Sequence, residues 1–273
     1  MKMKQRQKKI LMMKLLPINP RRIPEGMRLF SFCYQNTCGK IEIVIFRRKL
    51  MTVNIYMVRH GETYFNLLHR FQGWSDAPLT KKGIQDGYAA GTRLANVHFD
   101  GAYSSGLTRT IHTSQYILAN NKSDSPNQAI QLPDFREENF GYFEGVHTGL
   151  ALTTLGAYKN DTFSDFSDVI AKYGMPAAMD LIREGDPFKI AEDYQQFINR
   201  IQHGFDDILS RHQDGDNVLI VSHGTAIRAI ADYFGYHDFA KISVKNGAVT
   251  QLELDADHAK ITNFNDDSTI FNS

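Results

Sequence analysis

Two short segments of the chain pair an apolar run with a histidine and a glycine, a composition that suits a reaction centre. One run ends in His60–Gly61 and the other in His223–Gly224. A neutral imidazole is a good nucleophile near pH 7, and a neighbouring glycine lets a tetrahedral phosphoryl group approach the backbone closely. His60 is therefore a candidate for carrying a phosphoryl group.

Transfer of a phosphoryl group at His60 would require fixed donors for its negative charge. Guanidinium, imidazolium, amide and backbone N–H groups can supply them. Arg59 adjoins the candidate nucleophile. Arg109 follows a strand expected to end near Tyr103, and we expect it in the first turn of a helix capped by Ser105. The planar fork of an arginine suits phosphate better than a lysine would.

A proton donor for an alkoxide leaving group is expected in the segment 135–141. Glu137 is our candidate, since a carboxyl group partly desolvated beside an anionic phosphate should have a raised pKa. Glu138 and Glu144 compete with it for this role.

The elements around these residues alternate short apolar runs with longer amphipathic ones, as in a parallel sheet covered by helices. The run 53–58 is nearly all apolar, which is typical of a strand buried on both faces. We expect further strands at 99–103 and 218–221, a final hairpin of 249–254 with 259–262, and helices at 80–94 (capped by Thr80), 190–209 and 225–234. The predicted fold class is α/β, with a three-layer, doubly wound, mostly parallel sheet flanked by helices. Loops at the carboxyl ends of such strands converge on the ligand site, so His60 and His223 should face one crevice.

Residues 146–187 form the irregular part of this pattern. Glycines and prolines punctuate short helical pieces there, among them Gly156, Gly174 and Pro176. We predict that this insertion forms a small helical cap over the site.

The order of these motifs resembles that of the histidine phosphatase superfamily, the phosphoglycerate-mutase-like group. The resemblance covers essentially all of residues 51–254. Five segments carry it in family order: Arg59–Thr63 with Asn66 beyond it, Phe71–Thr80, Ser104–Arg109, Arg136–Gly145 and Ser222–Gly224.

The resemblance implies a role for each matching residue. His60 would be the phosphorylated residue and Glu137 the proton donor, while Gln72 and Gly73 would contact the substrate. The residues that would form the phosphate pocket are Arg59, Asn66, Arg109, His223 and Gly224. Members of the family need no metal, and the sequence shows no clustered metal ligands, so we expect neither a metal nor a cofactor.

The insertion and the segment before it indicate hydrolysis more than transfer between two positions of a substrate. Phosphoglycerate mutases of the family typically place a tyrosine where this chain has Phe140, a lysine shortly after Gly145, and an Arg-Arg pair in the insertion. Here 146–187 contains only Lys159, Lys172 and Arg183 as Lys or Arg residues. We therefore expect a metal-independent phosphatase of the histidine acid type that acts on phosphate monoesters of small molecules. A 2,3-bisphosphoglycerate-dependent phosphoglycerate mutase and a non-catalytic phospho-ligand binding protein are the alternatives.

The first 50 residues differ in kind from the rest of the chain. They carry 13 Lys or Arg against two Glu, whereas residues 51–273 carry 18 basic and 28 acidic side chains. Since no sustained period precedes Met51, we predict that 1–50 is a basic extension outside the folded domain, as a mis-assigned start codon would produce, and that 51–273 is the phosphatase domain. A basic arm for nucleic acid or an anionic membrane is the competing interpretation, and the basic residues lie on no recognisable motif for either.

The chain also carries indications of its compartment. Both cysteines, Cys33 and Cys38, lie in the first 50 residues, so the remainder fits a reducing environment. The early apolar run is interrupted by Lys14 and stopped by Pro17, well short of the roughly 20 residues that span a bilayer, and no small-residue cleavage site follows it. We expect a cytoplasmic protein whose partner is a phosphorylated small molecule, with no nucleic acid or membrane partner. No feature of the sequence indicates its oligomeric state.

Overall fold

The computed structural model describes residues 27–35, 41–49 and 51–272, and the chain divides after Leu50 into two units. In the first unit, β1 (Met27–Gln35) pairs antiparallel with β2 (Ile41–Lys49), so that Met27 lies opposite Lys49. The sequence pattern did not predict these two strands. That residues 1–50 lie outside the working domain remains a prediction.

The second unit is built on a six-stranded mixed sheet. The first four strands across it run parallel, in the order β5 (Ile130–Gln131), β4 (Gly101–Ser104), β6 (Asn217–Ser222) and β3 (Val53–Arg59). β7 (Val249–Leu254) then pairs antiparallel with β3, and β8 (Ala259–Asp266) antiparallel with β7. The predicted mostly parallel sheet and its final hairpin are confirmed.

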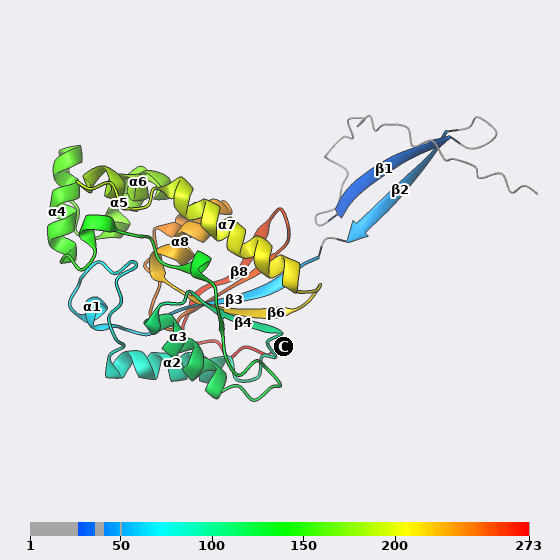
Figure 1. Ribbon diagram of the computed structural model, residues 1–273, viewed down its shortest axis with the longest axis horizontal. Helices are drawn as coiled ribbons and strands as arrows, with labels where there is room; N and C mark the ends of the chain where they lie inside the picture. The colour runs from blue at the N-terminus through cyan, green and yellow to red at the C-terminus, as the bar shows by residue number, and fades with distance from the viewer. Residues whose placement is uncertain (1–26, 36–40, 50, 273) are drawn as a thin grey trace, which may run out of the picture. The chain divides into compact units, whose positions relative to one another are not determined.

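Helices cover both faces of this sheet (Figure 1). α2 (Lys81–Arg93) and α3 (Thr108–Ala119) pack on one face, and α7 (Tyr194–Arg211) and α8 (Gly224–Tyr233) pack on the other. Successive side chains of β3 alternate between the two cores: Ile55 and Met57 join the α7–α8 side, and Tyr56 and Val58 the α2–α3 side. The predicted three-layer arrangement is therefore confirmed, and β3 is fully apolar because both of its faces are covered.

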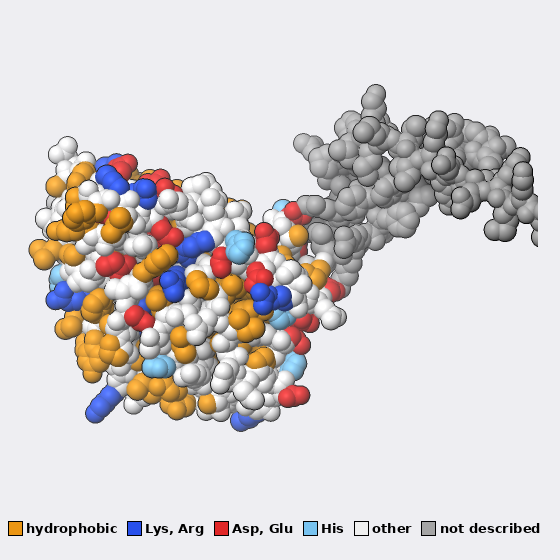
Figure 2. Space-filling view, viewed as in Figure 1, with side chains coloured by type: hydrophobic (Ala, Val, Ile, Leu, Met, Phe, Trp, Pro, Cys, Tyr) orange, Lys and Arg blue, Asp and Glu red, His pale blue; other side chains and the backbone are white. Residues whose placement is uncertain are grey.

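The insertion consists of three helices at the end of the sheet toward which β3 runs (Figure 1). They are α4 (Thr148–Lys159), α5 (Phe166–Tyr173) and α6 (Met175–Gly185). Asp165 caps α5, and Gly174, with a φ of +81°, ends it. In the view of Figure 2, exposed apolar side chains are frequent at the end of this unit that carries α4, whose Leu150 and Tyr158 are exposed.

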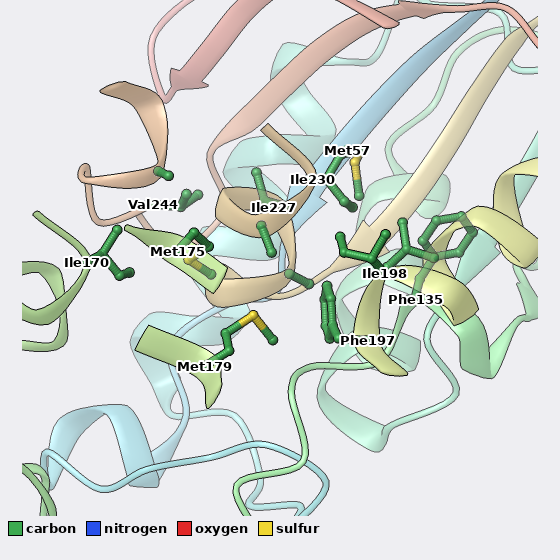
Figure 3. Close-up of a cluster of buried hydrophobic side chains, with 14 of the residues drawn as sticks. Met57, Phe135, Ile170, Met175, Met179, Phe197, Ile198, Ile227, Ile230 and Val244 are labelled. Atoms are coloured by element: carbon green, nitrogen blue, oxygen red, sulfur yellow. The ribbon is translucent and has the colours of Figure 1, made fainter. Parts of the chain in front are cut away.

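One apolar core joins the insertion to the sheet. Figure 3 shows Met175 and Met179 of α6 close to side chains of α7 and α8, with Met57 of β3 on the same side. Val244, which precedes β7, belongs to the same cluster. Since burial of apolar area contributes roughly 25 cal/mol per Å², this shared core holds the insertion firmly against the sheet.

Several predicted boundaries change in the structure. The helix expected from residue 190 begins at Tyr194, because Asp193 caps it in a capping box with Gln196, and Ile190 lies outside it and is exposed. The strand expected at 99–103 is β4, which begins at Gly101 and ends at Ser104. The predicted Thr80 cap of α2 is confirmed by a 3.0 Å hydrogen bond from the Gly83 N–H. The remaining short elements are α1 (Tyr64–Leu67), two 3-10 turns (Pro133–Phe135 and Gly141–Phe143) and α9 (His237–Ala240). Among the described residues, no helix combines the length and apolar composition needed to cross a bilayer.

Candidate active site

The carboxyl ends of two adjacent strands bring the two histidines together. β3 and β6 are in register with Arg59 beside Ser222, so His60 and His223 follow neighbouring strand ends. The His60 N–H donates to the Ser222 carbonyl at 3.0 Å, and the two imidazole rings lie edge to face with centroids 5.2 Å apart. The structure thus places both histidines in one site.

His60 is held as a neutral imidazole. Its Nδ1 lies 2.8 Å from the Gly61 carbonyl oxygen, which can only accept, so Nδ1 carries the proton and the lone pair is on Nε2. Burial holds the pKa of His60 well below its usual range, and the charges of Arg109 and Arg59 lower this pKa further. The side chain lines a cavity. His60 therefore has the protonation state of a nucleophile.

His223 is neutral as well, with the opposite tautomer. Its Nδ1 lies 3.1 Å from Nη2 of Arg109, a group that can only donate, so the proton is on Nε2, which lies 2.8 Å from Ser105 Oγ. Burial and then the charge of Arg109 hold the pKa of His223 well below its usual range. His223 and Arg109 are both fully buried, and neither lines the cavity.

The guanidinium of Arg109 is fixed by the loop that follows Gln72. Nη2 donates to the Gly73 carbonyl at 2.7 Å, and Nη1 donates to the Ser75 carbonyl at 2.9 Å and to Asp76 at 3.2 Å. Arg109 is 0% exposed. Gly73 is required at this place because a Cβ there would lie 2.0 Å from the Glu138 carbonyl oxygen.

The predicted cap of the Arg109 helix by Ser105 is wrong. α3 has Leu107 at its N-cap without a side-chain hydrogen bond, and the Thr108 N–H donates to a carboxylate oxygen of Asp76 from another loop. Ser105 Oγ is committed instead to Thr110 and to His223. The hydroxyl therefore bonds to the His223 ring and to Thr110 rather than capping the helix.

Three buried N–H donors around the histidines have no hydrogen-bond partner among the described residues. They are Nε of Arg59, Nε2 of Gln72 and Nε of Arg109. An unpaired buried donor is costly, and an anion in the cavity would offer acceptor oxygens to Arg59 and Gln72, which line it. Asn66 adds another donor, since its Oδ1 accepts the Thr63 N–H at 3.1 Å and its amide nitrogen has no hydrogen bond to a described residue.

The Glu137 carboxyl group sits at the start of α8. Its oxygens accept the N–H groups of Thr225 at 2.9 Å and Ala226 at 2.8 Å, and also that of Glu138 at 3.1 Å. Burial raises the pKa of Glu137, while these N–H donors and the charges of Arg109 and Arg59 oppose the rise. The group lines the same cavity as His60.

Arg200 of α7 holds the backbone on which Glu137 lies. Nη1 donates to the carbonyls of Asp134 at 2.7 Å and Arg136 at 2.8 Å, and Nη2 donates to the Glu137 carbonyl at 2.8 Å. Its Nε is paired with Glu192 at 2.7 Å. The sequence did not indicate this role, because one arginine on an amphipathic helix carries no signal of its contacts.

The two carboxyl groups that competed with Glu137 lie elsewhere. Glu144 accepts the backbone N–H groups of Gly73, Trp74 and Ser75 at 2.8–3.1 Å and so shapes the loop that holds Arg109. Glu138 is fully buried, and neither of its oxygens has a hydrogen-bond partner among the described residues. Neither residue lines the cavity.

The cavity at the histidines has a volume of about 180 Å³. The predicted residues that line it are Arg59, His60, Asn66, Gln72, Glu137 and Gly224, whereas Arg109, His223 and Gly73 do not line it. Lining residues that the sequence did not single out include Arg70, Thr148, Asp165, Arg228 and Ser243. No group of three or more His, Cys, Asp or Glu side chains that could hold a metal ion occurs in the described part of the chain.

Comparison with known proteins agrees with this geometry. The family model described as the histidine phosphatase superfamily (branch 1) matches residues 55–267. The chain belongs to this superfamily. The 2,3-bisphosphoglycerate-dependent phosphoglycerate mutase 2 of Gloeobacter violaceus is 29% identical over 209 residues, which cover 74% of this chain and 86% of the relative.

Two solved structures, of a mutase and of a phosphatase, also resemble the chain. A phosphoglycerate mutase from Bacillus anthracis matches with a TM-score of 0.73 and 32% identity over 80% of this chain and 95% of its own. An alpha-ribazole phosphatase from Shigella flexneri matches with a TM-score of 0.58 and 25% identity over 81% of this chain and 100% of its own. Both phosphatases and mutases are therefore among the structures that this fold resembles.

Proposed function

We propose that this protein hydrolyses phosphate monoesters of small molecules through a phosphohistidine at His60. The observation that carries the proposal is the neutral His60 with its lone pair on Nε2, in a cavity that is also lined by Arg59 and Gln72, each with a buried N–H that has no acceptor among the described residues. A phosphoryl group bonded to Nε2 would supply those acceptors. The proposed phosphate pocket consists of Arg59, Asn66, Arg109, His223 and Gly224, and the proposed substrate contacts are Gln72 and Gly73.

In the first step, Nε2 of His60 attacks phosphorus and the bond from phosphorus to the leaving oxygen breaks. The leaving alkoxide takes the proton of the Glu137 carboxyl group. Glu137 suits this role because burial raises its pKa and because an arriving phosphate dianion would favour its protonated form further. The products of this step are a free alcohol, phosphohistidine and the Glu137 carboxylate.

In the second step, a water molecule attacks the phosphorus of the phosphohistidine and the P–N bond breaks. The Glu137 carboxylate accepts the proton of the water, so that the proton donor of the first step is restored. The Nε2 lone pair of His60 returns, and inorganic phosphate leaves. Arg59, Arg109 and His223 stay fixed throughout, as electrostatic stabilisation requires.

The insertion supports hydrolysis because its cations are engaged away from the cavity. Lys159 pairs with Glu184 and Lys172 with Asp161, and neither lines the cavity. Phe140 lines it at the place where mutases typically have a tyrosine. A site that must retain a bisphosphorylated intermediate needs more positive charge than the insertion supplies here.

A phosphoglycerate mutase is the second candidate, and the names of similar proteins favour it. Both the Gloeobacter violaceus relative and the Bacillus anthracis structure carry that name. The two functions differ in one measurement. With 3-phosphoglycerate and catalytic 2,3-bisphosphoglycerate, a mutase forms 2-phosphoglycerate faster than free phosphate appears, whereas the proposed phosphatase does the reverse.

The proposal is tested with p-nitrophenyl phosphate in the presence of EDTA. We expect release of phosphate, an acid-labile phosphohistidine in the quenched enzyme, and loss of both in His60→Ala. His112→Ala is a matched control, because His112 is an exposed residue of α3. Activity that survives His60→Ala or requires a metal would refute the proposal, and phosphate binding without any phosphohistidine would indicate a non-catalytic binding protein. The cytoplasmic location likewise remains a prediction.

A further inference from the structure

The antiparallel pairing of β3 with β7 continues into the loop that precedes β7. The Arg59 N–H donates to the Ala248 carbonyl at 3.2 Å, and the Gly247 N–H donates to the Arg59 carbonyl at 2.9 Å. Gly247 has a φ of +70°, so the chain leaves the extended conformation there. The backbone pairing of this loop thus reaches Arg59, one residue before the nucleophile.

The side chain of Asn246 in the same loop reaches the nucleophile itself. Its Nδ2 donates to the His60 carbonyl at 2.9 Å and makes a longer contact of 3.4 Å with Oδ1 of Asn66. A side-chain amide nitrogen carries two N–H groups, so one can serve each acceptor. Asn246 does not line the cavity at His60, and it therefore contacts residues of the site and not a ligand.

The bond from Asn246 holds the peptide unit 60–61 at one end, and Thr113 holds it at the other. The His60 carbonyl accepts from Asn246, while the Gly61 N–H donates to Thr113 Oγ1 at 3.1 Å. The imidazole depends on this peptide unit, because Nδ1 of His60 bonds to the carbonyl of Gly61, the residue that follows it. Fixing the peptide unit therefore fixes the direction of the lone pair on Nε2.

The contact with Asn66 sets the direction of a second amide. Oδ1 of Asn66 faces two groups that can only donate, the Thr63 N–H at 3.1 Å and Nδ2 of Asn246. The amide nitrogen of Asn66 is the end left for the cavity, which Asn66 lines. The reversed amide would bring its nitrogen against both donors and turn its oxygen toward an anion.

We propose that Asn246 is a positioning residue of the site, whose single amide group orients both the nucleophile His60 and the phosphate donor Asn66. The proposal rests on the phosphatase function above and deepens it. Its two parts have separate effects. The orientation of His60 governs the rate of phosphoryl transfer, whereas the orientation of Asn66 governs the affinity for phosphate. A side chain that only filled space in the loop would affect stability alone.

The first test measures the rate of phosphoryl transfer in Asn246→Leu, which keeps the size of the side chain and removes its donors. Rapid quenching follows phosphohistidine formation from saturating p-nitrophenyl phosphate in the full-length protein. We expect the rate to fall at least about tenfold, because the nucleophile loses its fixed direction. An unchanged rate would overturn the proposal.

Asn120→Leu is the matched control for this measurement. Asn120 is partly buried, as Asn246 is, and its Nδ2 donates to a backbone carbonyl, that of Tyr88, at 3.0 Å. It lies at the end of α3 and does not line the cavity. We expect its rate to stay within about twofold of the unsubstituted protein.

The second test measures binding of inorganic phosphate without turnover. Calorimetry on the full-length His60→Ala protein compares Asn246 with Asn246→Leu, once with Asn66 present and once in Asn66→Ala. We expect Asn246→Leu to weaken phosphate binding about two- to tenfold when Asn66 is present, and to have no effect in Asn66→Ala. An equal loss in both backgrounds, or no loss in either, would overturn the proposal.

A second variant keeps both tests decisive if Asn246→Leu does not fold. Asn246→Ala removes the same donors with a smaller side chain, and we expect the same slower transfer and the same dependence on Asn66. Thermal melts identify the folded variants. If neither variant folds, Asn246 serves the fold and not the orientation of the site, and the proposal fails.

Failure of the proposal and failure of the phosphatase function give different results. Absence of phosphohistidine in the unsubstituted protein would refute the phosphatase function, and the phosphate-binding comparison would still test the contact between Asn246 and Asn66. Phosphohistidine formation that Asn246→Leu leaves unchanged would refute only the role of Asn246.

Discussion

The protonation states of His60 and Glu137 set opposite limits on the pH range of the reaction. Burial lowers the pKa of His60, so the nucleophile stays neutral at pH values where an exposed histidine would be protonated. Burial raises the pKa of Glu137, so the acid keeps its proton at pH values where an exposed glutamate would have lost it. Activity should therefore fall as pH rises through the Glu137 pKa, because the leaving group loses its proton donor. On the acid side, it should persist below pH 6.5, the unperturbed value for histidine.

A pH profile of kcat/KM with an alkyl phosphate measures these limits. In Glu137→Gln we expect the alkaline limb to disappear and hydrolysis of the alkyl phosphate to fall by about 10²–10⁴-fold. Hydrolysis of p-nitrophenyl phosphate should fall less, since p-nitrophenolate leaves without a proton. An equal loss for both substrates would show that Glu137 is not the proton donor.

Glu138 is a buried carboxyl group whose effect should be on stability. Burial raises its pKa well above the usual range, and the charges of Glu137 and Glu192 add to this. The folded protein thus keeps a proton that the unfolded chain releases above about pH 4.3, so stability falls as pH rises from there toward the folded-state pKa. We expect Glu138→Gln to remove this loss because its amide cannot ionise.

Thermal melts at pH 5 and pH 8 test this expectation. Glu138→Gln should melt higher than the unsubstituted protein at pH 8, by about 2–4 °C for each kcal/mol regained, and the difference should shrink at pH 5. Glu184→Gln is the control, because Glu184 is an exposed partner of Lys159 and should show no such pH dependence. A lower Tm at pH 8 for Glu138→Gln would contradict the assignment.

At the scale of elements, α7 places the proton donor through Arg200. Its guanidinium donates to the backbone carbonyls of Asp134, Arg136 and Glu137, and it pairs with Glu192. Arg200→Met should displace Glu137 without touching His60. We expect kcat for an alkyl phosphate to fall at least about tenfold more than kcat for p-nitrophenyl phosphate, because only the first reaction depends on the acid.

The control for this variant is Arg211→Met on the same helix. Arg211 is half exposed and pairs with Asp207 four residues earlier, so its loss should change neither rate. If Arg200→Met lowers both rates equally, the guanidinium supports the fold of the site and not the position of the acid.

The sequence indicated side chains at strand ends better than side chains on helix faces. His60 and His223 follow apolar strands, and their convergence is required by parallel pairing of those strands. Arg228 and Arg200 look like ordinary polar positions on amphipathic helices, and only the tertiary structure shows what they contact. The capping box of Asp193 with Gln196 is a local pattern that the expected helix start at residue 190 missed, whereas the Asp76 carboxylate at the start of α3 comes from a distant loop and has no local pattern.

On the scale of the whole molecule, the second unit begins with its own anchors. The Thr52 N–H donates to Asp214 at 3.0 Å and the Asn54 N–H to the Asp216 carbonyl at 2.8 Å, so the entry into β3 is fixed by the loop before β6. Every strand of the six-stranded sheet and every residue that lines the cavity lies within residues 51–273. The contacts that the structure describes at the site therefore all lie within the second unit.

Removal of residues 1–50 tests whether the working protein begins at Met51. We expect the shortened chain to keep kcat/KM and to retain its free energy of unfolding within about 0.5 kcal/mol, the usual effect of changes away from the core. A second truncation that also removes 51–54 takes away buried Val53 and both anchors to the loop, so it should melt lower and lose activity. A comparable loss in the first truncation would mean that the basic segment belongs to the domain. If the shortened protein keeps its activity but binds an anionic resin more weakly, the positive charge of residues 1–50 contributes to binding of anions and not to the reaction at His60.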